Sequence, residues 1–334
     1  MEGMEAPLLD DWLARRTYDA ADFPLDRLLE AKRDTISVIL PAKECAATLP
    51  PLLDHLGELR EAGLVDEVLV VDAASRDGTA DVAARHGARV EQEDELLPEY
   101  GPALGKGDAM WRGLSATSGQ IVAFLDADST GVEREFVVGV LGPIVCHREL
   151  ALVKGAFARP FAPAGGGPPI PDGGGRVTEL MARPLINLHV PELAGFAQPL
   201  AGEIAARRSL LERLPFPAGY GVEIGMMIDA LRAVGLDALA QVHLGARQNR
   251  HQPLRALGAM AYAVLVAAER RLGRDPRPGP YVLPFADEPP RRVAVEERPP
   301  LRTIGRTAGR GDGHAWPGSP PTATDRSSFA GRSR

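Results

Sequence analysis

The sequence lacks the features of a secreted, disulfide-bonded or membrane protein. Its two cysteines, Cys45 and Cys146, are too few for a disulfide framework or a thiolate zinc site. No apolar run approaches the roughly 18 residues that a membrane-spanning helix needs. The first residues, MEGMEAPLLDDW, lack the basic start and the apolar centre of a signal peptide. We therefore expect reduced thiols, no membrane partner and a cytoplasmic location.

Two nucleotide-binding motifs are also absent. No GxGxxG follows the first predicted strand, and no GxxxxGK[ST] occurs anywhere, which disfavours dinucleotide-binding and P-loop enzymes. The net charge of -7 argues against a nucleic-acid partner. Residues 289–334 contain nine Arg against four Asp and Glu, so this tail carries +5 and the rest of the chain -12. An anionic ligand would have to be held by local cations.

The 334 residues are 45% hydrophobic and 25% charged, which is typical of a globular protein with one large domain or two moderate ones. In residues 35–149, apolar strands alternate with amphipathic helices, and this pattern predicts a mainly parallel α/β sheet. Residues 150–288 are predicted to be more helical. Residues 1–34 are predicted to form a polar, partly helical extension, and the Pro-, Gly- and Arg-rich tail 289–334 to be flexible.

Polar residues follow three predicted strands, in the segments 41–44, 72–75 and 126–128. In an open α/β sheet, ligands bind beyond the carboxyl ends of the strands, so these segments should meet at one crevice. Asp126 and Asp128 are separated by one residue, and two carboxylates so placed suit a hard divalent cation that bridges a diphosphate. The alternative is that both aspartates cap helices or face water.

Glycine-flanked polar residues supply further candidates. Lys106 lies between two glycines at a predicted helix start, where it could meet phosphate, although it could equally be a solvated lysine. Three glycines precede Arg176 in a turn that suits an anion or serves as a hinge. Glu223 could bind sugar hydroxyls or only complement its helix dipole. His251 follows Arg247 and Arg250 after a strand, and could be a metal ligand or a surface residue.

A resemblance to a known family joins these motifs. The segments ILPAKECAATL, VVDAASRDGTAD, GKGDAMWRGLSATSGQIVAFLDAD, GGGRVTELMARPL, QPLAGE, PFPAGYGVEIGMMID and QVHLGARQNRHQPL resemble, in order and spacing, the actinobacterial glucosyl-3-phosphoglycerate synthases and a related mannosyl-3-phosphoglycerate synthase of glycosyltransferase family 81. The resemblance runs from about Ile36 to Met260. It implies a GT-A fold whose C-terminal half binds the acceptor. It also implies retaining transfer of a hexose from a nucleotide diphosphate sugar to the 2-hydroxyl of D-3-phosphoglycerate, Mg²⁺ or Mn²⁺, and a homodimer. The product would be a compatible-solute precursor.

The resemblance also implies residue roles. The nucleotide sugar would contact Pro41, Ala42, Lys43, Glu44, Ser75, Lys106, Asp126, Ala127, Leu200, Tyr220 and Glu223. The acceptor would contact Gly175, Arg176, Thr178, Asn249 and Arg250, and the metal Asp128 and His251. The residues expected to act in catalysis are Lys106, Asp128 and Glu223.

Two departures from the family pattern affect the donor and the metal. The family's Asn-Glu pair after the Pro-Ala step is replaced by Glu44 and Cys45, and the family's metal-binding His falls on Asn249, with His251 two positions later. The first change favours a guanine nucleotide, hence GDP-mannose, with GDP-glucose and UDP-glucose as alternatives. A strict UDP-glucose-dependent glucosyl-3-phosphoglycerate synthase is the second hypothesis. A sugar-1-phosphate nucleotidyltransferase and a non-catalytic sugar-nucleotide-binding protein are more distant ones.

Overall fold

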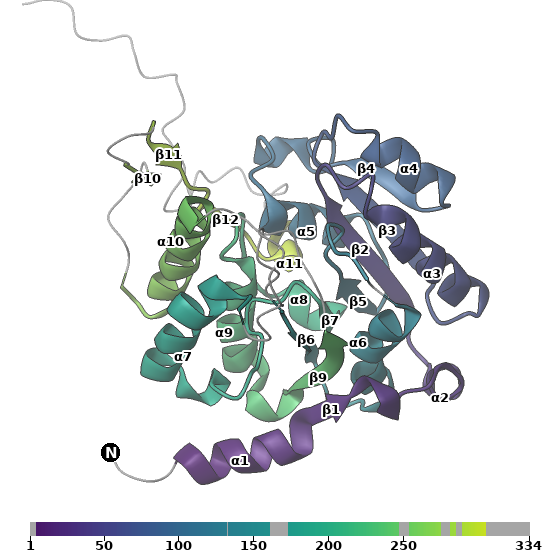
Figure 1. The fold of residues 1–334 in the computed structure, drawn as a ribbon, viewed down its shortest axis with the longest axis horizontal. Helices are drawn as coiled ribbons and strands as arrows, with labels where there is room; N and C mark the ends of the chain where they lie inside the picture. Colours follow the sequence, from purple (N-terminus) through teal and green to yellow (C-terminus); the bar gives the residue numbers. More distant parts are fainter. Residues whose placement is uncertain are drawn as a thin grey trace, which may run out of the picture.

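The computed structural model describes residues 5–131, 133–160, 173–246, 254–274, 281–284 and 289–304. Its centre is an eight-stranded sheet in the order β1-β9-β6-β7-β5-β2-β3-β4 (Figure 1). The strands are β1 (Thr17–Asp19), β2 (Ile36–Ala42), β3 (Glu67–Asp72), β4 (Arg89–Gln92), β5 (Ile121–Phe124), β6 (Leu152–Ala158), β7 (Ile204–Arg207) and β9 (Leu239–Ala246). Only β7 runs antiparallel to its neighbours β5 and β6 in this sheet. The predicted mainly parallel α/β sheet is confirmed.

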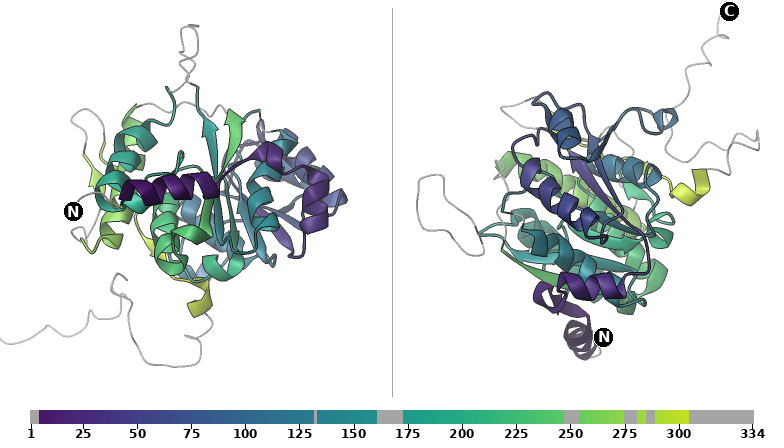
Figure 2. Two further views of the ribbon diagram at one scale, coloured as in Figure 1. Left: turned by 90° about the horizontal axis from the view of Figure 1, so that it is seen from below. Right: turned by 90° about the vertical axis from the view of Figure 1, so that its right-hand side faces the viewer.

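Helices cover both faces of the sheet, as Figures 1 and 2 show. One face packs against α2 (Leu25–Ala31), α3 (Leu49–Glu61), α4 (Thr79–Arg85) and α6 (Arg134–Cys146). The other packs against α1 (Glu5–Arg16), α5 (Lys106–Ser115), α7 (Arg183–His189), α8 (Arg208–Leu211), α9 (Val222–Val234) and α10 (Leu254–Arg271). In β2, Val38 and Leu40 face the first set and Ile39 the second. Because both faces are buried, the strand is apolar without alternation.

The amphipathic stretch predicted to follow the first strand is helix α3. Its buried leucines recur three or four residues apart, from Leu49 through Leu52, Leu53 and Leu56 to Leu59, which places them on one side of the helix. Two prolines occupy the first turn, where a helix leaves its N–H groups without internal partners. The sequence therefore specifies both the start and the buried face of this helix.

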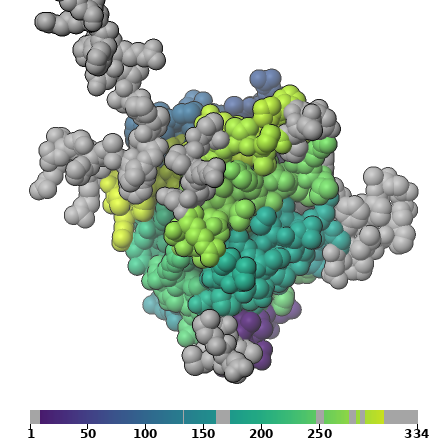
Figure 3. All heavy atoms as spheres, turned by 90° about the vertical axis from the view of Figure 1, so that its left-hand side faces the viewer, coloured from purple at the N-terminus to yellow at the C-terminus, as the bar shows by residue number. Residues whose placement is uncertain are grey.

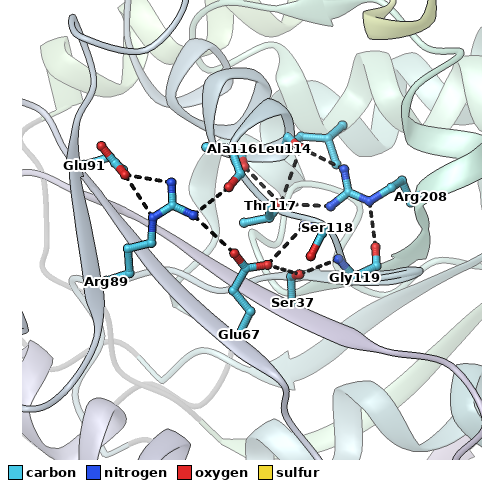
Figure 4. A network of polar contacts seen from close by, with 11 residues as sticks. Ser37, Glu67, Arg89, Glu91, Leu114, Ala116, Thr117, Ser118, Gly119 and Arg208 are labelled. Atoms are coloured by element: carbon cyan, nitrogen blue, oxygen red, sulfur yellow. Dashed lines mark hydrogen bonds and ion pairs between the residues drawn. The ribbon is translucent and has the colours of Figure 1, made fainter.

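A polar network fastens the amino-terminal edge of the sheet (Figure 4). The Ser37 hydroxyl donates to Glu67 Oε2 at 2.7 Å and accepts from the Gly119 N–H at 2.8 Å. Arg89 donates to Glu67 Oε1 at 3.3 Å. A Cβ on Gly119 would lie 2.4 Å from the Ser37 nitrogen, so this close approach requires glycine. These contacts lie at the edge of the sheet opposite to the carboxyl ends of its strands.

The first residues extend the sheet. Strand β1 pairs in parallel with β9 and forms one edge. The Trp12 indole N–H donates to the carbonyls of Leu236 and Leu239, and its ring is buried. The sequence predicts only an extension over residues 1–34, because β1 is three residues long and the sequence Thr-Tyr-Asp carries no apolar pattern.

The structure differs from the predicted flexible tail at residues 289–304. This segment contains β11 (Arg291–Arg292), paired with β10 (Val282–Leu283), β12 (Glu297–Arg298), paired with β8 (Phe216–Pro217), and α11 (Leu301–Ile304). Figure 3 shows the face that the second half of the chain forms, with this segment in yellow-green and yellow. Its order depends on pairing with distant residues, which local composition does not reveal. Residues 305–334 lie outside the described part.

Five short helical segments complete the described chain. They are η1 (Ala20–Asp22), η2 (Pro98–Tyr100), η3 (Thr178–Ala182, a π-helix that continues into α7), η4 (Pro191–Leu193) and η5 (Leu236–Ala238). Within the described ranges, no helix has both the length and the apolar character needed to cross a bilayer.

Candidate functional site

Two loops at the carboxyl ends of β2 and β3 brace each other. The Glu44 N–H donates to the Ser75 hydroxyl at 2.9 Å, and Glu44 Oε1 accepts from the Arg76 N–H at 2.9 Å. The Cys45 N–H donates to Thr79 Oγ1 at 2.9 Å. Glu44 and Ala74 have φ values of 53° and 52°, in the left-handed region that non-glycine residues rarely adopt. Glu44 is predicted to contact the nucleotide, but one of its carboxylate oxygens instead holds the two loops together.

The neighbouring strand ends carry further polar groups. Pro41 and Ala42 end β2, and Lys43 is exposed just beyond them. Asp72 ends β3, is buried, and accepts through Oδ2 from the Ser75 N–H at 3.2 Å. Asp72 Oδ1 is also buried and has no hydrogen-bond partner within the described ranges. This edge therefore offers a carboxylate oxygen to an N–H donor.

A lysine and two carboxylates from three elements form the centre of the site. Lys106 Nζ lies 2.6 Å from Asp126 Oδ1 and 2.7 Å from Glu223 Oε1. Lys106 opens α5, Asp126 follows β5, and Glu223 lies in the first turn of α9 and is 3% exposed. Burial by itself would lower the pKa of Lys106, but the two carboxylates raise it above its ordinary value. The ammonium is therefore charged, and the structure brings these three predicted residues together.

A glycine fits closely around this ion cluster. A Cβ on Gly202 would lie 2.0 Å from Asp126 Oδ1 and 2.6 Å from Lys106 Nζ, so any side chain there would displace the pair. Lys154, inside β6 and 1% exposed, donates to the carbonyl of Ala201 beside this glycine. Burial lowers the pKa of Lys154 to about 7. Neither Gly202 nor Lys154 is among the residues predicted from the sequence, although a lysine inside an apolar strand is a visible signal.

The predicted acceptor turn lies beside Arg159, which is not among the residues predicted from the sequence. The Gly174 N–H donates to the Arg159 carbonyl at 2.9 Å, and a Cβ on Gly175 would lie 3.7 Å from Arg159 Cδ. Gly175 has a φ of 65°, which favours glycine. Thr178 is buried, and Arg176 is partly exposed at the start of the helical segment. Arg159, Gly175 and Thr178 therefore lie together.

The remaining predicted residues are distributed around the cluster. Ala127 is buried and its carbonyl accepts from Thr48 Oγ1 at 2.8 Å, whereas Asp128 is exposed. Leu200 is partly buried, and Tyr220, 45% exposed, precedes α9. Three predicted residues, Asn249, Arg250 and His251, lie outside the described ranges. Among the residues that are described, no three His, Cys, Asp or Glu side chains group as a metal site.

A buried ionic network supports the start of α5. Asp108 accepts from Arg112 Nε at 3.0 Å and from Arg298 Nε at 2.8 Å. The Trp111 indole donates to the Pro299 carbonyl at 2.8 Å, so the C-terminal segment packs against α5. Burial, reinforced by the Asp108 charge, raises the pKa of Glu93 in this region to about 7.

Comparisons with known proteins agree with this arrangement. Residues 37–131 match the model of glycosyl transferase family 2. The chain is 41% identical to a glucosyl-3-phosphoglycerate synthase of Mycolicibacterium paratuberculosis, over 88% of this chain and 92% of that protein. The crystal structure of mannosyl-3-phosphoglycerate synthase from Rubrobacter xylanophilus is 44% identical, with a TM-score of 0.79 over 88% of this chain and 99% of that one.

A second crystal structure is similar. It is the glucosyl-3-phosphoglycerate synthase from Mycobacterium tuberculosis in complex with Mn²⁺, UDP-glucose and phosphoglyceric acid. It is 41% identical, with a TM-score of 0.76 over 84% of this chain and 95% of that one.

Proposed function

The chain belongs to the glucosyl-3-phosphoglycerate and mannosyl-3-phosphoglycerate synthases, a family of hexosyltransferases, and from this premise we propose that it transfers a hexosyl group to the 2-hydroxyl of D-3-phosphoglycerate with retention at the anomeric carbon. The donor is a nucleotide diphosphate sugar. The observation that supports this proposal most directly is the contact of Lys106 with Asp126 and Glu223. One cation and two carboxylates meet there, from the end of β5 and the starts of α5 and α9.

The donor set at the end of β5 fits Mg²⁺ or Mn²⁺. Asp126 and Asp128 supply hard carboxylate oxygens, which these ions prefer. Asp128 is exposed beside the cluster, so Asp128 and diphosphate oxygens could bind the same ion. We propose His251 as a further ligand of this ion. When bound, the metal neutralises charge on the nucleotide diphosphate that leaves.

Lys106 is the protein group that we assign to the leaving diphosphate. Its ammonium is fixed by two carboxylates, so it could donate to a phosphate oxygen with little rearrangement, which is the condition for effective electrostatic stabilisation. Gly105, with a φ of 133° that favours glycine, directly precedes Lys106 at the start of α5. Glu223, Leu200 and Tyr220 would then bind the sugar.

The route that we propose is departure and attack on the same face of the sugar. Asp126 and Glu223 each have a carboxylate oxygen in contact with Lys106, which opposes the use of either as a nucleophile. A leaving phosphate oxygen would accept the proton of the attacking hydroxyl. A glycosyl adduct on Glu223, trapped and identified by mass spectrometry, would contradict this route.

The acceptor would lie against the Gly175 turn. Gly175, Arg176 and Thr178 supply N–H groups, a guanidinium and a hydroxyl at the start of one helical segment, a combination that binds phosphate. Asn249 and Arg250 are the further acceptor residues in the proposal. We expect Arg176→Ala to raise the KM for 3-phosphoglycerate far more than the KM for the donor, in steady-state kinetics. Equal effects on both would move Arg176 out of the acceptor site.

For the donor we favour GDP-mannose, with strict use of UDP-glucose as the second candidate. The replacement of the family's Asn-Glu pair by Glu44 and Cys45 supports the first, because Glu44 Oε1 is occupied by a backbone N–H. The M. tuberculosis relative that is bound to UDP-glucose supports the second. Asp72 Oδ1 would accept an N–H from either guanine or uracil. The homodimer and the cytoplasmic location stay predictions.

One assay tests the proposal. The protein is incubated with Mg²⁺ or Mn²⁺, 3-phosphoglycerate and, in turn, GDP-mannose, GDP-glucose, UDP-glucose and ADP-glucose, and the products are identified by mass spectrometry. We expect a hexosyl-phosphoglycerate with at least one donor, and its absence with all four would refute the proposal. Lys106→Met should remove most activity, whereas the control Lys32→Met, which changes a lysine paired with Asp66 at 2.7 Å on the opposite edge, should not.

A further inference from the structure

We propose that Arg159 binds the carboxylate of the acceptor and thereby selects an acceptor that carries both a carboxylate and a phosphate. This inference rests on the proposed function. Arg159 directly follows β6 and lies against the glycine turn, with its carbonyl accepting from the Gly174 N–H at 2.9 Å. Its Cδ is 3.7 Å from the position that a Cβ on Gly175 would occupy.

The guanidinium of Arg159 has no anionic partner at contact distance among the described residues. Its Nε is buried without a hydrogen-bond partner there, and its ring neighbour is Phe157, 4.8 Å from the guanidinium carbon to the ring centroid. The buried arginines Arg112 and Arg298 contact Asp108, and the buried Arg271 contacts Asp229. Arg159 is half-buried, and a partly desolvated charge without an anionic partner is costly, so Arg159 is suited to an anionic ligand.

The charges around Arg159 link it to the donor-side carboxylates. Burial lowers the pKa of Arg159, and the negative charges of Asp126, Glu223 and Asp128 oppose this effect. An arginine remains charged despite such a shift. Asp126 and Glu223 make their contacts with Lys106 at 2.6 and 2.7 Å. Arg159 therefore lies within the field of the donor-side carboxylates and next to the acceptor turn.

The chemistry of 3-phosphoglycerate assigns its two anionic groups. The carboxylate is attached to the carbon that bears the reacting hydroxyl, and the phosphate is one carbon further away. Arg159 lies against the turn and is influenced by the donor-side carboxylates, so it matches the carboxylate, which it could bind in bidentate geometry. The Gly175 turn, at a helix start, matches the phosphate. A buried Gln198 Oε1 without a described partner, 3.9 Å from the Cβ position of Gly175, adds an unused polar atom beside the same turn.

Binding measured without donor separates this inference from the proposed function. We compare 3-phosphoglycerate with glycerol 3-phosphate, which lacks the carboxylate, by calorimetry on the wild type, Arg159→Met and Arg159→Lys. Arg159→Met should weaken 3-phosphoglycerate binding by roughly 10- to 100-fold, as expected for a lost hydrogen bond to a charged group. Glycerol 3-phosphate binding should change little, and Arg159→Lys should retain part of the affinity. The control Arg183→Met, which changes an arginine paired with Glu179 at 2.8 Å, should retain both affinities.

The outcomes are distinguishable. An equal loss for both acceptors would place Arg159 on the phosphate, and unchanged binding of both would remove it from the acceptor site; either result overturns the inference. If the wild type forms no product but binds 3-phosphoglycerate through Arg159, the proposed function fails and the inference stands. A folding defect is monitored by the Tm without ligand, which should be equal or higher in Arg159→Met because a charge without a partner is removed. Arg159→Lys keeps the test valid if the methionine variant does not fold.

Discussion

The C-terminal segment 289–304 depends on a buried ion pair, and replacing Arg298 with alanine should weaken the whole domain. Arg298 is 8% exposed, and it donates to Asp108 Oδ1 at 2.8 Å and to Asp108 Oδ2 at 2.5 Å. It also donates to the carbonyl of Pro102 at 2.9 Å. Asp108 is fully buried, so its charge would lose its principal partner in a medium that does not solvate it.

The size of the loss in the free energy of unfolding depends on the contacts that Asp108 keeps. Removing one partner of a buried pair costs roughly 3–5 kcal/mol. Arg112 Nε stays 3.0 Å from Asp108 Oδ1, which places the expected loss in the free energy of unfolding near the lower end, about 3 kcal/mol. At roughly 2–4 °C per kcal/mol, the Tm should fall by about 6 to 12 °C. Activity should fall as well, because Asp108 lies two residues after Lys106 in α5.

The assay is urea and thermal unfolding, followed by far-ultraviolet circular dichroism and by tryptophan fluorescence, which Trp111 reports from beside Pro299. The control is Arg292→Ala in the same segment, since Arg292 is 77% exposed and pairs with Glu296 at 3.3 Å. An exposed pair of this kind contributes at most about 1 kcal/mol. A loss below about 1 kcal/mol in Arg298→Ala, or equal losses in both variants, would refute the view that the segment is an integral part of the domain.

Three further predictions concern the site and its surroundings. Burial raises the pKa of Glu93 from 4.5 to about 7, so its contribution to the free energy of unfolding is fully present below about pH 4.5 and is lost as the pH rises through about 7. Glu93→Gln should therefore flatten the pH dependence of Tm between these two values. Parallel curves for both proteins would contradict this. Gly202→Ala should lower kcat by at least about tenfold, because its Cβ would lie 2.0 Å from Asp126 Oδ1 and would displace Lys106; unchanged kinetics would show that the pair is not needed. Chelation by EDTA should abolish turnover, and addition of Mn²⁺ should restore it. Asp128→Asn should require a higher Mn²⁺ concentration for half-maximal rate. Full activity in EDTA would exclude the metal site.

The sheet and the donor edge could be predicted because they leave local signals. A strand such as β2 is apolar throughout, since it is buried on both faces, and the polar residues that follow it mark its carboxyl end. Lys106, Asp126 and Glu223 were selected separately, from a glycine-flanked turn, a strand end and a helix start. Their contact could be expected because the resemblance fixed the topology that brings α5, β5 and α9 together.

The features that the sequence did not predict depend on long-range contacts. Arg159 follows an ordinary apolar strand, and only the structure shows that its buried Nε has no partner in the described residues. Strand β1 is too short to leave a periodic pattern and exists because β9 presents a free edge. The segment 289–304 has the Pro and Arg content of a flexible tail, but Arg298 finds a buried carboxylate on α5. For β1 and for Arg298, the partner lies far away in the sequence.

The acidic balance of the chain now has a local explanation. Lys106 does not offer a free positive charge to the diphosphate, because Asp126 and Glu223 lie at 2.6 and 2.7 Å and leave this cluster with a net charge of about -1. A diphosphate would therefore be repelled unless other positive charge enters with it, and a divalent cation on the Asp128 side meets that need. The acceptor faces the same difficulty. Since Arg159 has no anionic partner at contact distance among the described residues, its charge is available to attract the acceptor. The acceptor would then be held by charges that the donor side does not use.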